Sequence, residues 1–232
     1  MFIRSILFPV AAWLSVWSLC AQQTLQEKLQ HKQYAAVLAM SDSLAPAAAA
    51  GYSTLFAFGQ AAEGLLKYPE AYDYYQRCLE LDSTLSDTWN ALARTAALMG
   101  RTSEAETLYT KVLEADSLDF YANHQLARLY YQSGEYEKAL AGYARLQAKD
   151  VDNPVLWQAI GNCYARQELP AEAAIAYFKA FGSNPRHAGL AQDLVNTLLR
   201  LGGDFIAEAV AVSDTALLYN PGNRPLLRNK GM

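Results

Sequence analysis

The sequence repeats itself at a fixed interval of about 34 residues through most of its length. Alanine recurs at this spacing, and a tyrosine follows each of these alanines four residues later. The pairs are Ala71 and Tyr75, Ala105 and Tyr109, Ala139 and Tyr143, and Ala173 and Tyr177. A separation of four residues places both side chains of a pair on one face of a helix. The fixed period therefore predicts a stack of similar helical units, each of which buries its apolar face against its neighbours.

A second set of positions predicts another helix upstream in each unit. Large and small residues recur there at steps of three and four residues, which is helical spacing. They are Leu55, Phe58 and Gly59; Trp89, Leu92 and Ala93; Asn123, Leu126 and Ala127; and Trp157, Ile160 and Gly161. The small residue lets two helix backbones approach closely, and the two tryptophans are expected in the core. Gly100, Gly134 and Gly202 mark the helix ends, so each unit is predicted to be helix, turn, helix.

This pattern resembles the tetratricopeptide repeat family, whose signature combines Trp, Leu, Gly and Tyr in the first helix with Ala, an aromatic residue, Ala and Pro in the second. The unit over 154–187 matches every position, with Ile in place of Leu, at Trp157, Ile160, Gly161, Tyr164, Ala173, Tyr177, Ala180 and Pro185. The resemblance implies an all-α fold, a right-handed superhelical solenoid of antiparallel helix pairs. It also implies a non-catalytic protein that binds other proteins.

The frame divides the chain into a leader, an atypical first unit, five repeats and a tail. The repeats span 52–85, 86–119, 120–153, 154–187 and 188–223, and the last of them has two extra residues around Gly202. Residues 22–51 are expected to form a degenerate repeat that caps the array, because Tyr34 keeps the frame while Pro46 shortens the second helix. The tail, 224–232, is expected to be too short to cover Leu217 and Leu218. That end is predicted to be a surface for self-association or docking.

Residues 1–21 have the features of an export signal. One positive charge, Arg4, precedes an apolar run over 6–19, and small residues come before a polar stretch. The run is shorter than the roughly 20 residues of a spanning helix. We therefore expect cleavage near Ala21 and an exported protein of the bacterial periplasm or cell envelope. A lipid anchor on Cys20 is the alternative, and membrane association is expected only if this segment is retained or lipidated.

Charge and motif content exclude several classes of function. The chain has 19 basic and 23 acidic side chains, a net charge of −4, which gives no general attraction for nucleic acid. It contains no Gly-rich phosphate loop, GxSxG, HExxH, EF-hand loop or paired CxxC motif. His31, His124 and His187 fall in different units, and Cys78 and Cys163 are expected to be core thiols rather than a disulfide. No cofactor, metal or catalytic site is therefore expected.

The resemblance places the candidate binding surface on the inner side of the first helices. In this family the fifth and ninth residues of each unit face inward, and the next turn adds further polar residues. We expect a partner to contact Asn90, Arg94, His124, Arg128, Asn162, Arg166 and Asn196. Since amides can bind a partner's backbone and arginines can bind carboxylates through two parallel hydrogen bonds, the expected partner is a protein or extended peptide with an acidic segment. Solvated surface, or pairing of the arginines with nearby acids, is the alternative.

Two other functions stay open. The chain also resembles the outer-membrane β-barrel assembly lipoprotein, another small exported array of such repeats, which would make it a subunit of an outer-membrane assembly or secretion complex. In a different class, it would be an enzyme or a carbohydrate-binding protein whose site consists of scattered residues that no motif reveals.

Overall fold

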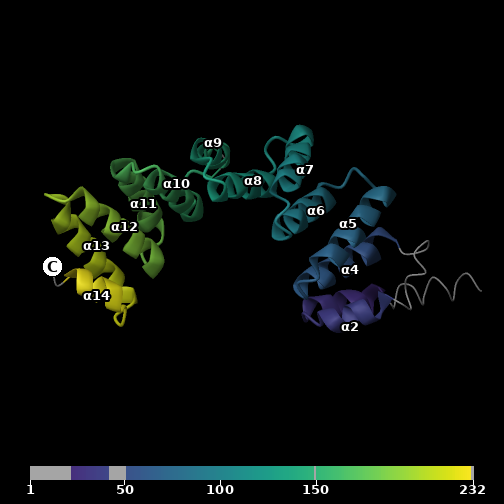
Figure 1. Cartoon of the computed structure of the whole chain (residues 1–232). Helices are drawn as coiled ribbons and strands as arrows, with labels where there is room; N and C mark the ends of the chain where they lie inside the picture. Colours follow the sequence, from purple (N-terminus) through teal and green to yellow (C-terminus); the bar gives the residue numbers. More distant parts are fainter. Residues whose placement is uncertain (1–21, 42–50, 149, 231–232) are drawn as a thin grey trace, which may run out of the picture. The chain divides into compact units, whose positions relative to one another are not determined.

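Helices joined by short turns make up the described structure. A computed structural model describes residues 22–41, 51–148 and 150–230, which contain no strand (Figure 1). The helices are α2 (Tyr34–Ala39), α4 (Tyr52–Gly64), α5 (Tyr68–Leu81), α6 (Ser86–Leu98), α7 (Thr102–Ala115), α8 (Phe120–Gln132), α9 (Tyr136–Gln147), α10 (Pro154–Arg166), α11 (Pro170–Ser183), α12 (Ala188–Leu201), α13 (Phe205–Tyr219) and α14 (Arg224–Lys230). Residues 22–30 are also helical. The all-α fold class predicted from the sequence is confirmed.

The chain forms two compact bodies, which are described separately. The N-terminal body is Met1–Val112 and the C-terminal body is Leu113–Met232. The expected export signal, Cys20 and Pro46 lie outside the described residues. Within the described ranges, no helix is both long enough and apolar enough to cross a bilayer.

Helix starts follow the repeat frame that the sequence predicts. The first helices of successive pairs, α4, α6, α8, α10 and α12, begin at residues 52, 86, 120, 154 and 188. The second helices α2, α5, α7, α9 and α11 begin at 34, 68, 102, 136 and 170. Side-chain caps fix several of these starts: Asp119 accepts from Ala122 N–H at 2.7 Å, Asn153 caps α10, and His187 Nδ1 caps α12.

The turn inside each helix pair holds a residue with positive φ, and this residue recurs with the same period. The residues and angles are Lys32 (55°), Leu66 (62°), Gly100 (77°), Gly134 (81°), Glu168 (60°) and Gly202 (67°). Glycine adopts this conformation without steric cost, whereas other residues are less stable there by roughly 1–2 kcal/mol. Lys32 belongs to the series, so residues 22–41 share the backbone frame of the repeats.

Glu168→Gly should raise the free energy of unfolding by about 0.5–1 kcal/mol. Glycine removes the steric cost at this φ of 60°, and its greater freedom in the unfolded chain offsets part of the gain. Gly134→Ala makes the opposite change at the equivalent turn and should lower the free energy of unfolding by about 1 kcal/mol. Urea denaturation measures both changes, and equal stabilities for the three proteins would contradict the role given to this position.

Repeated tyrosines and small residues form the core. The tyrosines Tyr75, Tyr109, Tyr143 and Tyr177 are at most 4% exposed. A Cβ added to Gly59 would lie 2.5 Å from the ring of Tyr75. A Cβ on Gly161 would lie 2.6 Å from the ring of Tyr177. The aromatic ring of one helix thus occupies the space that glycine leaves on its partner, which explains why small residues recur in the first helices.

The sequence predicts that Trp89 and Trp157 are core residues, but both are only half-buried. The indole N–H of Trp157 donates to the carbonyl of Val151 at 2.7 Å, and the Lys179 ammonium lies 4.0 Å from its ring centroid. Trp89 makes equivalent contacts with the preceding turn and with a lysine. An indole whose N–H must reach the turn before the helix lies at the edge of the core rather than in its centre.

The cysteines behave as core residues. Cys78 and Cys163 are buried and free, as predicted. Burial raises the pKa of each thiol to about 11, so both stay protonated and unreactive at neutral pH. No group of three or more His, Cys, Asp or Glu side chains in the described part could hold a metal ion.

Helix α14 changes the expected end of the array. The sequence assigns 224–232 to a tail, but residues 224–230 are helical and Leu226 is fully buried in the cluster formed with α12 and α13. α14 begins at the point where the frame would start one further repeat, yet it is only 7 residues long. The end is therefore partly covered, since Leu217 is half-buried while Leu218 is 81% exposed.

Candidate functional site

Contacts between successive first helices identify a shared polar face in the C-terminal body. Arg166 Nε of α10 donates to the Tyr131 hydroxyl of α8 at 3.4 Å. Gln158 Nε2 of α10 donates to Asp193 Oδ2 of α12 at 3.4 Å. Helical spacing adds the side chains one or two turns away from these four on the same helix faces. We therefore define the polar face as His124, Arg128, Tyr131, Gln158, Asn162, Arg166, Asp193 and Asn196. It contains all five contact residues that the sequence predicts for this body.

Three of those predicted residues are exposed, namely Arg128, Arg166 and Asn196. Arg128 takes part in no ion pair among the residues that the structure describes. Asn196 Oδ1 accepts a hydrogen bond from Gln192 Nε2 at 2.9 Å. The side chains reach solvent and are held by weak local contacts that a ligand can replace.

Asn162 and His124 are half-buried and are held more firmly. Asn162 Oδ1 accepts from the Tyr177 hydroxyl at 2.8 Å, which fixes the orientation of the amide. The His124 ring meets Tyr143 edge-on, with ring centroids 6.0 Å apart. Burial, together with the charge of Arg128, lowers the pKa of His124, so its imidazole is neutral at pH 7 and offers one donor and one acceptor.

Asp193 is a member of the polar face that sequence reasoning missed. Its carboxyl is half-buried, and burial raises its pKa, while the Gln158 hydrogen bond and the nearby His187 act in the opposite direction. Its spacing of three residues from Asn196 was the available signal, because that spacing puts both on one helix face. The polar face therefore combines two exposed arginines on α8 and α10 with one acid on α12.

The two predicted residues of the N-terminal body have different surroundings. Arg94 Nη2 forms an ion pair with Glu63 Oε2 at 2.5 Å, and the Tyr75 hydroxyl donates to the same carboxylate at 3.2 Å. The pairing alternative that the sequence leaves open is therefore observed at Arg94. Asn90 is only 6% exposed, and its Oδ1 has no hydrogen-bond partner among the described residues. A buried acceptor of this kind is destabilising until a donor reaches it.

A pocket of about 440 Å³ opens beside the Glu63–Arg94 ion pair. Gln60 also lines it, and helix 22–30 and Tyr34 supply another wall. Gly64 is needed for this wall, because a Cβ there would overlap the Tyr34 ring. Charged, amide and aromatic side chains thus line one pocket in this body.

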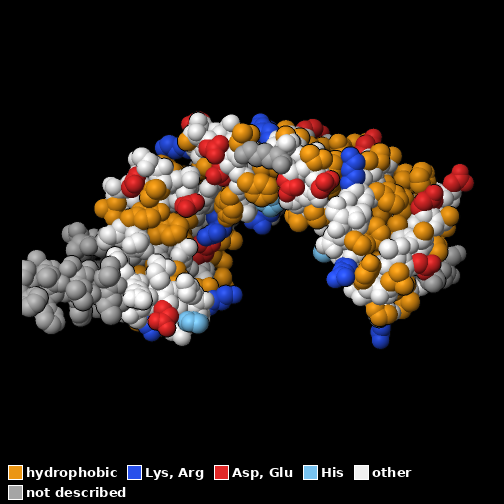
Figure 2. All heavy atoms as spheres, turned by 180° about the vertical axis from the view of Figure 1, so that it is seen from behind, with side chains coloured by type: hydrophobic (Ala, Val, Ile, Leu, Met, Phe, Trp, Pro, Cys, Tyr) orange, Lys and Arg blue, Asp and Glu red, His pale blue; other side chains and the backbone are white. Residues whose placement is uncertain are grey.

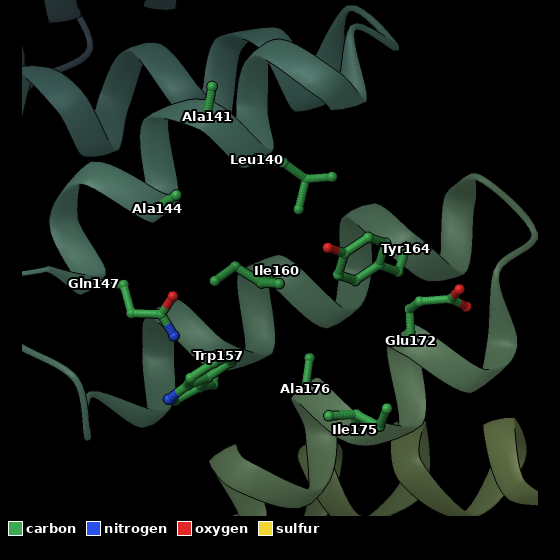
Figure 3. A pocket seen from close by; sticks show the side chains of 10 residues that line it. All are labelled: Leu140, Ala141, Ala144, Gln147, Trp157, Ile160, Tyr164, Glu172, Ile175 and Ala176. Carbon is green, nitrogen blue, oxygen red and sulfur yellow. The ribbon is translucent and has the colours of Figure 1, made fainter.

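A second pocket, of about 540 Å³, lies in the C-terminal body between α9, α10 and α11 (Figure 3). Its lining is mostly apolar, and none of the predicted contact residues belongs to it. In the view of Figure 2 the exposed charges of both signs are scattered among apolar side chains, without a continuous basic patch.

Sequence comparison identifies the repeats. Two family models described as tetratricopeptide repeat match residues 96–163 and 74–107. The human protein O-mannosyl-transferase TMTC1 is 26% identical over 167 residues, which cover 70% of this chain. The chain spans only 19% of that relative's length.

Solved structures share the fold at low sequence identity. MamA from Desulfovibrio magneticus matches with a TM-score of 0.66 and 17% identity, over 75% of this chain and 97% of MamA. YrrB, described as a tetratricopeptide repeat protein with an unusual peptide-binding site, matches with a TM-score of 0.61 and 18% identity, over 77% of this chain and 91% of YrrB. PilF from Pseudomonas aeruginosa matches with a TM-score of 0.63 and 18% identity, over 77% of this chain and 80% of the PilF chain. These likenesses show the shared fold, and the two family models, together with the repeated alanine and tyrosine positions, identify the chain as one built of tetratricopeptide repeats.

Proposed function

We propose that the chain is a non-catalytic scaffold that binds a protein or an extended peptide on the polar face. The observation that carries this proposal is the continuity of the face, because hydrogen bonds link α8 to α10 and α10 to α12 through residues of equivalent turns. Amides such as Asn162 and Asn196 can bind both the donors and the acceptors of a peptide backbone. YrrB, which has the same fold, is described as having a peptide-binding site.

An acidic segment is the proposed chemistry of the partner. Arg128 and Arg166 are exposed and can each bind a carboxylate through two parallel hydrogen bonds. Asp193 would repel a carboxylate of the partner, since two negative charges a few ångströms apart raise each other's energy. The acidic groups of the partner are therefore expected over α8 and α10, and its backbone or a basic side chain over α12.

The N-terminal body supplies a further contact region in this proposal. Arg94 lines the pocket of about 440 Å³, so a partner group that enters it meets a guanidinium, a carboxylate and an amide together. Asn90 is only 6% exposed and offers a partner little of its side chain.

The proposed location is the bacterial cell envelope, and it rests on the leader of residues 1–21. Mass spectrometry of the native N-terminus tests it, because cleavage near Ala21 gives an unmodified start and lipidation gives acyl chains on Cys20. Acyl chains would favour the alternative of a lipid-anchored subunit of an outer-membrane assembly or secretion complex. Catalytic turnover or saturable sugar binding by the purified chain would favour an enzyme or a carbohydrate-binding protein.

Crosslinking in envelope fractions tests the binding proposal. We would compare the wild type with Arg128→Ala/Arg166→Ala and with a control, Arg145→Ala/Arg228→Ala, which removes two exposed arginines outside the polar face. Captured partners are identified by mass spectrometry, and their acidic segments are then titrated as synthetic peptides. The face variant should raise the Kd about 30-fold, which corresponds to about 2 kcal/mol, and the control should leave it unchanged. Equal binding by both variants would place the interface elsewhere.

A further inference from the structure

The pocket between α9, α10 and α11 is lined by apolar side chains from three helices (Figure 3). Trp157, Ile160 and Tyr164 of α10 form its floor, with α9 on one side and Ile175 of α11 on the other. Ile175 is 60% exposed. Covering such a side chain is favourable, because each Å² of apolar surface removed from water contributes roughly 25 cal/mol.

Small side chains on α9 keep this pocket open. Ala144 lines it, and the equivalent positions one repeat earlier and one repeat later are Thr110 and Phe178. The repeat therefore accepts a phenylalanine at this position, while alanine leaves the space to a group from outside. A volume of about 540 Å³ lies in the range of pockets that enclose small ligands, so a phenylalanine or leucine side chain fits.

The two ends of the pocket differ in charge. Glu172 lies at the end beside Tyr164, is exposed, and takes part in no ion pair among the described residues (Figure 3). Gln147 lines the other end beside Trp157, whose ring lies 4.0 Å from the Lys179 ammonium. A cation beside an apolar anchor is therefore favoured at the Glu172 end, and an anion is disfavoured there.

From this arrangement we infer that the pocket is a second binding site, which takes one phenylalanine or leucine side chain of a partner protein with a lysine or arginine of that partner beside Glu172. The apolar anchor supplies most of the binding free energy, and the cation supplies selectivity. The inference is independent of the polar face, where the expected partner charge has the opposite sign. A basic side chain of the partner is thus favoured at the pocket, whereas an acidic one is favoured over α8 and α10.

Three capped dipeptides test the site on the full chain: N-acetyl-Phe-Lys-amide, N-acetyl-Phe-Glu-amide and N-acetyl-Ala-Lys-amide. The reporter is the NMR signal of the Trp157 indole N–H, because this ring lines the pocket. We expect saturable shifts with Phe-Lys at millimolar concentration, a Kd about fivefold higher for Phe-Glu, and no saturation with Ala-Lys.

Two variants and one control complete the test. Ala144→Phe fills the pocket from its own helix and should abolish the Phe-Lys shifts, whereas Thr110→Phe makes a matched change one repeat earlier and should leave them intact. Glu172→Gln should keep the binding of phenylalanine but remove the preference for lysine over glutamate, and circular dichroism checks that each variant is folded. Absence of saturation in the wild type, undiminished binding by folded Ala144→Phe, or an unchanged preference in Glu172→Gln would each overturn the inference.

Discussion

Gly161→Val is expected to lower the free energy of unfolding by about 2–3 kcal/mol, because overpacking of a core typically costs amounts of this order. A Cβ at this position would lie 2.6 Å from the ring of Tyr177, which is only 3% exposed and packs within the core of the C-terminal body. A β-branched side chain adds crowding within the helix. Urea denaturation followed by circular dichroism measures the change.

Gly182→Ala is the matched control for this prediction. Gly182 lies in α11, and a Cβ there would meet no atom within 4 Å. Alanine has the higher helix propensity, so this substitution should raise the free energy of unfolding by about 0.5 kcal/mol. The two glycine substitutions should therefore have opposite signs. If both stabilise the protein, the close approach of Tyr177 to α10 is not a constraint.

Tyr75→Ala is expected to lower the free energy of unfolding by about 3–5 kcal/mol, as is typical for removal of a large buried aromatic ring. Tyr75 is fully buried, so the substitution leaves a cavity between α4 and α5. It also removes a donor to the Glu63 carboxylate. Burial, followed by the charge of Glu63, raises the pKa of Tyr75, so the hydroxyl stays protonated and continues to donate in the native protein.

Tyr75→Phe separates the hydroxyl from the ring. It keeps the packing and removes one hydrogen bond to a carboxylate, so the free energy of unfolding should fall by about 1–3 kcal/mol, less than for alanine. Tyr219→Ala serves as the control, because Tyr219 is 47% exposed. Its substitution should change the free energy of unfolding by about 0.5 kcal/mol at most, as is usual at the surface. If Tyr75→Phe destabilises as much as Tyr75→Ala, the stabilisation comes from the hydroxyl and not from the ring.

Periodicity alone predicts the helices because each repeat buries the same positions. The recurring pairs of alanine and tyrosine, such as Ala173 and Tyr177, reflect one packing geometry that returns in the four repeats over 52–187. The positive-φ turn is only partly visible in the sequence, because Leu66 and Glu168 adopt it without being glycine. Helix α14 could also have been predicted, since Leu226 holds the frame position of Leu190 once the two extra residues around Gly202 are counted.

The candidate sites depend on contacts that do not repeat. Arg94 meets Glu63, 31 residues away, because of the side-chain conformations in that one pair of helices. The apolar pocket is invisible in the sequence for a different reason. Ala144 is an ordinary helix former in an exposed helix position, so the sequence gives no sign of a pocket there. Only the structure shows that Ala144, the floor of α10 and Ile175 line the same pocket.

The regular recurrence of the positive-φ turn bears on how such a chain can change its length. Deleting residues 134–167 would join Ser133 directly to Glu168, a residue with φ of 60° in place of Gly134 with φ of 81°. The new junction would have the backbone geometry that the turn already had. Recombination between equivalent turns can therefore insert or remove whole repeats in a single genetic step, and the altered protein inherits a connection that is already compatible with folding.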